Sequence, residues 1–130
     1  KEPSIQAVWL DSSLAEFKMI LRDEIARYGM PHDFGPAVSF AGKILTGIDP
    51  TKLSPAFALT SQQHYFFTHG DKDLRILKHH FDFLQQYAST HNIKAKFWLA
   101  ENSYHVDAMF KYPEEYGLRM KGFFESNLNK

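Results

Sequence analysis

The chain has 130 residues, 44% of them hydrophobic, and its 15 basic and 15 acidic side chains give a formal net charge of zero. This predicts a single globular domain over residues 1–130, and gives no support for nucleic-acid binding or a membrane-surface patch. No apolar run approaches the roughly 18 residues of a membrane helix, and no signal peptide is visible.

The sequence contains no cysteine, which excludes disulfides and a thiol nucleophile. Cysteine usage does not choose between cytoplasm and periplasm, so the compartment stays unknown, with the cytoplasm favoured. Because the chain begins without a methionine and enters an apolar strand-like run within a few residues, we expect it to be part of a longer or processed polypeptide.

The first predicted element is a strand at Ile5–Leu10, a continuous apolar run. A helix is expected after it, because Ser13 and Glu16 have the spacing of a capping box and the following apolar residues fall on one face. This helix should end near Tyr28, just before Gly29.

A second helix is expected over residues 34–45, with Gly47 at its C-cap. Two proline dipeptides, Asp49-Pro50 and Ser54-Pro55, then interrupt the chain, and such irregular stretches often lie over binding sites. Residues 31–60 are therefore a candidate cap or lid segment, and a plain surface excursion is an equal alternative.

The central predicted strand, Tyr65–Thr68, is aromatic and β-branched without polar alternation, which is typical of a strand covered on both faces. Gly70 allows a sharp exit, and Asp73 then precedes a helix expected from Leu74 to about Asn92. A third strand is predicted at Ala95–Ala100.

The loop after the third strand is expected at Glu101–Tyr112, and a last helix should open at Pro113. Strands separated by helices predict βαβ units. The predicted fold class is therefore α/β, a three-stranded parallel sheet with flanking helices.

Asp73 and His105 follow the second and third predicted strands. Neighbouring parallel strands lie about 4.8 Å apart and end at the same edge of a sheet, so the two loops should be adjacent. A carboxylate beside an imidazole fixes its tautomer and stabilises its protonated form, as a general base requires.

These residues resemble the α/β-hydrolase family. His69-Gly70-Asp71-Lys72-Asp73 resembles the HGxxD segment that carries the acid of the Ser-Asp-His triad, and Ser103–Ala108 followed by Pro113–Tyr116 is similar to the histidine segment of bacterial members. The stretch Gly47–Pro55 and the strand end Asp11-Ser12 are similar to the region after the nucleophile helix. The resemblance covers the whole chain as the C-terminal half of such a fold, and implies Asp73 as acid and His105 as base.

A serine hydrolase also needs a serine on a G-x-S-x-G elbow and an oxyanion loop, and the sequence has neither. We therefore expect the nucleophile of a serine esterase or peptidase-like hydrolase to come from outside this chain, which should not hydrolyse an acyl substrate alone. No cofactor is expected. No metal is expected either, because the adjacent His79 and His80 would face different directions on a helix.

Simpler interpretations stand beside these. Asp73 could merely cap a helix, and His105 could be a structural or solvated histidine. Asp11 also ends a strand, where some related enzymes place the acid, but a turn residue is favoured there, and Ser12 and Ser13 are helix caps before they are nucleophiles.

Two other functions are open. The chain could be a non-catalytic association module, forming a homo-oligomer or receiving an N-terminal fragment through the strand edge at Ile5–Leu10. It could also be a flavodoxin-like binding domain, which Asp73 and His105 lying far apart would favour.

Overall fold

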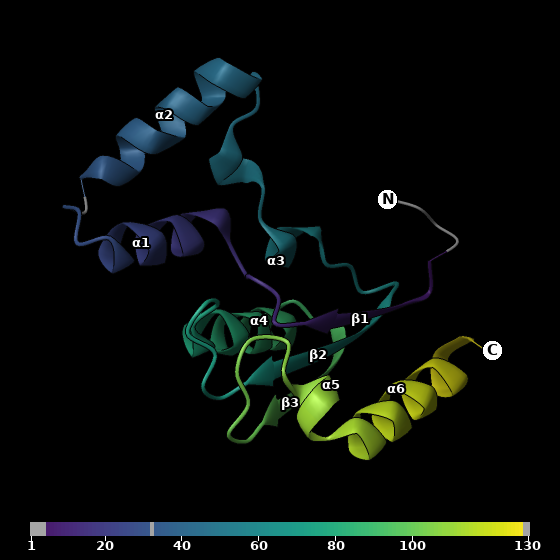
Figure 1. Ribbon diagram of the computed structural model, residues 1–130. Helices are drawn as coiled ribbons and strands as arrows, with labels where there is room; N and C mark the ends of the chain where they lie inside the picture. The colour runs from purple at the N-terminus through teal and green to yellow at the C-terminus, as the bar shows by residue number, and fades with distance from the viewer. Residues whose placement is uncertain (1–4, 32, 129–130) are drawn as a thin grey trace. The chain divides into compact units, whose positions relative to one another are not determined.

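The computed structural model describes residues 5–31 and 33–128, and the chain divides into two compact units. Residues 1–13 and 59–130 form the first, called here the sheet unit, and residues 14–58 form the second, the helical unit. Figure 1 labels the three strands and the six α-helices of the two units. No helix within the described ranges is long and apolar enough to cross a membrane.

The sheet unit contains three parallel strands in the order β1-β2-β3. Its elements are β1 (Ala7–Asp11), β2 (His64–Gly70), α4 (Lys78–Thr90), β3 (Lys94–Ala100), α5 (Ala108–Lys111) and α6 (Pro113–Leu128). The predicted α/β fold with a three-stranded parallel sheet is confirmed. The first strand begins two residues later than expected, and the loop after the third strand includes the short helix α5.

Helices α4 and α6 cover opposite faces of this sheet: α6 packs on the face of Phe66 and α4 on the face of Phe67 and Phe97, and successive strand side chains point to opposite faces. On one face Trp9 stacks on Phe66, with ring centroids 4.1 Å apart, and Phe123 of α6 packs 5.6 Å from Phe66. On the other face Phe81 of α4 packs edge-on against Phe97 at 5.5 Å. Because helices cover both faces of the sheet, side chains on both sides of β2 are buried, which explains the continuous run of apolar residues Tyr65–Phe67.

The helix predicted to start at Leu74, after the central strand, in fact starts later, since α4 begins at Lys78. The predicted start is therefore wrong. The Asp73 carboxylate accepts hydrogen bonds from the backbone N–H groups of Arg75 and Ile76, and so stabilises a separate turn. Leu77 then adopts an extended conformation as the N-cap residue. Asp73 therefore caps a turn that is distinct from the helix.

The helical unit is built from α1 (Phe17–Arg27), α2 (Phe34–Thr46), the 3-10 helix η1 (Pro50–Lys52) and α3 (Pro55–Ala58). The second predicted helix matches α2 closely, and Gly47 is its C-cap residue in the left-handed conformation, with φ of 70°. This unit contains nearly all of the candidate cap segment at residues 31–60, whose role stays a prediction.

The predicted capping box at the start of the first helix does not form. Glu16, not Ser13, is the N-cap residue of α1, and it makes no side-chain capping bond. Ala15 is fully buried, and its carbonyl oxygen accepts the backbone N–H of Ala56 at 3.0 Å. Packing against α3 thus keeps the residues before Phe17 extended.

Candidate active site

The loops that follow β2 and β3 lie against each other because Gly70 has no side chain. A Cβ atom at this position would lie 2.3 Å from the carbonyl oxygen of Ser103 and 2.4 Å from that of Tyr104. Hydrogen bonds between the loops run from the Lys72 N–H to the Ser103 oxygen at 2.9 Å and from the Ser103 N–H to Asp71 Oδ1 at 3.1 Å. Glycine is therefore needed here for space between the loops.

The buried carboxylate of Asp73 accepts three hydrogen bonds. Its Oδ1 accepts the N–H groups of Arg75 and Ile76 at 2.8 and 2.9 Å, and its Oδ2 accepts from Nδ1 of His105 at 2.8 Å. Burial alone would raise the pKa of Asp73, but the bonds from His105 and the two backbone groups outweigh it and hold that pKa below its ordinary value. The carboxylate is thus kept ionised beside an imidazole.

The hydrogen bond to Asp73 Oδ2 orients the ring of His105. An ionised carboxylate only accepts hydrogen bonds, so Nδ1 must carry the proton, and Nε2 of the neutral ring is then the basic nitrogen. The side chain is 38% exposed, so the ring can be reached from outside the core. The structure thus brings the two predicted site residues together, and the separation that would favour a flavodoxin-like domain is absent. Their catalytic roles stay predictions.

A second imidazole, that of His69, lies near the same oxygen of Asp73. Nε2 of His69 is 3.9 Å from Asp73 Oδ2 and has no hydrogen-bond partner within the described residues. Burial lowers the pKa of His69 below its ordinary value, although Asp73 opposes the shift, so this ring stays neutral near pH 7. His105 therefore makes the only short imidazole bond to Asp73 in the described structure.

The end of β1 supports the His105 loop. The hydroxyl of Ser12 donates to Asp11 Oδ1 at 3.3 Å and accepts the backbone N–H of Val106 at 3.1 Å. The hydroxyl of Tyr116 donates to Asp11 Oδ2 at 2.9 Å. Asp11 is thus bonded to Tyr116 and Ser12, and Asp73 is the carboxylate that bonds to His105.

Burial shifts the pKa values of both Asp11 and Tyr116. It raises the pKa of Asp11 despite the opposing bonds from Tyr116 and Ser12. Burial, together with the bond to Asp11, raises the pKa of Tyr116 to about 12, so this phenol remains a proton donor to the carboxylate near neutral pH. Sequence reasoning missed this support, because Tyr116 lies 105 residues from Asp11 and no local pattern links them.

Replacing Asp73 with asparagine is expected to lower the free energy of unfolding at pH 7 by roughly 2 kcal/mol, because a charged acceptor of three hydrogen bonds is lost. The pKa of Asp73 is lowered in the folded chain, so the stability due to its charge is present above its unfolded value of about 3.9 and disappears as pH falls through the folded value. The difference between the two proteins in urea titrations should therefore shrink below about pH 4.

The matched control is Asp82→Asn, at an exposed residue of α4 that pairs with Lys78. Its effect should stay within about 0.5 kcal/mol at every pH, as for other exposed ion pairs. A difference for Asp73→Asn that is as large at pH 3 as at pH 7 would contradict the assignment.

An esterase from Pyrococcus furiosus has a similar structure, with a TM-score of 0.67 and 15% sequence identity, over 98% of this chain and 47% of that chain. At this identity the likeness shows the fold alone, and this chain spans about half the length of the esterase. No family model and no curated protein matches the sequence.

Proposed function

We propose that this chain supplies the acid and the base of a serine hydrolase that cleaves esters or peptide-like acyl compounds. The 2.8 Å bond from His105 to the buried Asp73 is the observation that carries the proposal. Its place at the carboxyl edge of a parallel sheet, where α/β folds bind ligands, supports it, as does the likeness of the fold to an esterase.

In this mechanism Nε2 of His105 takes the proton of an attacking serine hydroxyl as that oxygen adds to the acyl carbonyl carbon. The imidazolium that forms is stabilised by the carboxylate of Asp73, which its backbone hydrogen bonds hold in place. The same nitrogen then returns the proton to the departing alcohol or amine. Water then hydrolyses the acyl-enzyme: Nε2 of His105 takes a proton from the attacking water and returns it to the serine oxygen as the acyl group leaves.

The attacking serine must come from polypeptide outside this chain. Near the dyad, Ser12 and Ser103 are buried, and both hydroxyls make hydrogen bonds within the sheet unit. Neither lies on a G-x-S-x-G elbow. We therefore take the chain to be the C-terminal part of a bacterial-type α/β-hydrolase that is inactive alone, with residues 31–60 as its cap.

Intact mass and fluorophosphonate labelling of the native polypeptide test this proposal. We expect a mass larger than that of 130 residues, and labelling by the fluorophosphonate at a serine outside them. The 130-residue chain alone should remain unlabelled. A native mass equal to that of this chain, or a labelled serine within it, would contradict the proposal.

The edge of β1 is the proposed site of association. Within the described residues β1 pairs only with β2, so its other side presents unpaired backbone N–H and C=O groups. This observation also favours the second candidate function, a homo-oligomer or a complex with an N-terminal segment joined through the edge predicted at Ile5–Leu10. Light scattering of the isolated chain should show a dimer or larger species, and a monomer at all concentrations would exclude self-association.

A further inference from the structure

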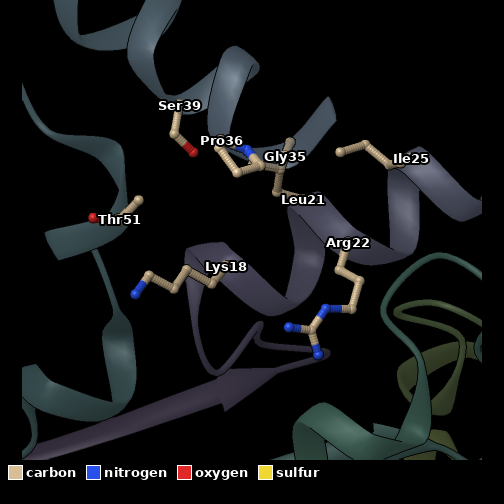
Figure 2. Close-up of a pocket in the computed structure, with 8 residues that line it drawn as sticks. All are labelled: Lys18, Leu21, Arg22, Ile25, Gly35, Pro36, Ser39 and Thr51. Atoms are coloured by element: carbon tan, nitrogen blue, oxygen red, sulfur yellow. The ribbon is translucent and has the colours of Figure 1, made fainter. Parts of the chain in front are cut away.

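The helical unit contains a cavity of about 390 Å³ lined by residues of α1, α2 and η1 (Figure 2). Every lining residue belongs to residues 14–58, so the cavity is a feature of this unit alone. Its volume lies near the lower end of the range for small-molecule sites, which suits a ligand of about ten non-hydrogen atoms.

One part of the lining is apolar. Leu21 and the buried Ile25 come from α1, and Pro36 faces them from α2. Thr51 adds its methyl group, because its hydroxyl donates to Asp49 Oδ1 at 2.6 Å, and Figure 2 shows that oxygen on the side away from the other lining residues. An alkyl chain can replace water along this wall.

Three further lining side chains carry hydrogen-bond donors. Lys18, Arg22 and Ser39 line the cavity, and their side chains have no hydrogen bond or ion pair with any described residue. Figure 2 shows Lys18 extending toward Thr51, while Arg22 turns its guanidinium away from Ser39. Among the described residues, no carboxylate lines the cavity. A ligand should therefore present acceptors to Lys18 and Ser39.

We propose that this cavity binds an amphipathic monocarboxylate, such as a medium-chain fatty acid. The carboxylate accepts hydrogen bonds from the Lys18 ammonium and the Ser39 hydroxyl, and the alkyl chain lies against Leu21, Ile25 and Pro36. An alcohol of equal length would lack the charge for Lys18, and inorganic phosphate would leave the apolar wall in contact with water. The site is distinct from the proposed catalytic dyad and does not depend on it.

Titration of the isotope-labelled 130-residue chain with octanoate, followed by NMR, tests the proposal. We expect saturable binding with a Kd of about 1 mM, as ten non-hydrogen atoms of ordinary ligand efficiency allow. The amide shift changes should be centred in residues 14–58. Octanol should bind about fivefold more weakly, the scale of an exposed ion pair, and phosphate should not saturate.

Two variants locate the ligand. Lys18→Met should weaken octanoate about fivefold and bring its affinity to that of octanol, whereas Lys43→Met, on α2 outside the cavity, should change nothing. Gly35→Leu should remove binding, because a Cβ there would meet Ile25 Cδ1 at an unstrained 3.8 Å and the added side chain can occupy the cavity. Ala37→Leu, outside the lining, is its control.

Equal affinity for octanol and octanoate would overturn the recognition of the carboxylate. Saturable phosphate binding, shift changes centred outside the helical unit, or an unchanged affinity in Lys18→Met would each overturn the proposed site. Because the readout is binding, none of these results depends on whether Asp73 and His105 are catalytic.

Discussion

Under the proposed function, replacing His105 with alanine should reduce kcat/KM for p-nitrophenyl esters about 10⁴-fold in a longer polypeptide that supplies the nucleophile. The variant has no base to take the serine proton, and the charge of Asp73 then has no imidazolium to stabilise. Most of the loss should fall on kcat, because the imidazole acts in the transition state and contributes little to substrate binding. Steady-state kinetics with a short-chain ester measure both parameters.

The matched control is His91→Ala. His91 follows α4, where it stacks on Tyr87 with ring centroids 3.9 Å apart, and it takes no part in the proposed dyad. Its removal should leave kcat/KM within about twofold of the parent, less than 1 kcal/mol. Turnover that survives His105→Ala unchanged would end the assignment of His105 as base.

Replacing Gly70 with alanine should lower the free energy of unfolding by roughly 3 kcal/mol, the upper range for forcing an atom into a packed site. The added methyl group would meet backbone carbonyl oxygens of Ser103 and Tyr104, which cannot rotate away as a flexible side chain can. The loop carrying His105 must then move, so the bond to Asp73 should weaken as well. Urea denaturation measures the first effect, and the His105 ring signals in NMR spectra report the second.

Gly117→Ala and Gly122→Ala serve as controls. Both glycines lie in α6, and a Cβ at either would meet no atom within 4 Å. Alanine should therefore stabilise the helix by roughly 0.5–1 kcal/mol at each position. If Gly70→Ala behaved like these two variants, the close approach of the loops would be wrong.

The strands are predictable from sequence because each is a short run of apolar and aromatic residues bounded by turn residues. Such runs favour a buried parallel sheet whichever residues cover them. This also brings the loops of Asp73 and His105 together, since the two loops follow neighbouring strands that point the same way. The proximity of Asp73 and His105 is therefore predictable from the sequence through the geometry of a parallel sheet.

The helix starts are less predictable, because tertiary contacts decide them. Ser13 and Glu16 have the spacing of a capping box, yet the bond between Ala15 and Ala56 keeps the chain extended past them. Asp73 has the local features of a helix cap, but its carboxylate also binds His105. Each of these partners lies more than 30 residues away, beyond the reach of a local pattern.

The two outer strands of the sheet differ in charge. Lys94 and Lys96 are exposed on β3, whereas β1, Ala7–Asp11, is uncharged until its last residue. Lysines on an outer strand discourage another chain from adding there. In the proposed self-association, copies of this chain would then join at the β1 side only, so that growth would end with a closed pair and would not propagate into fibrils.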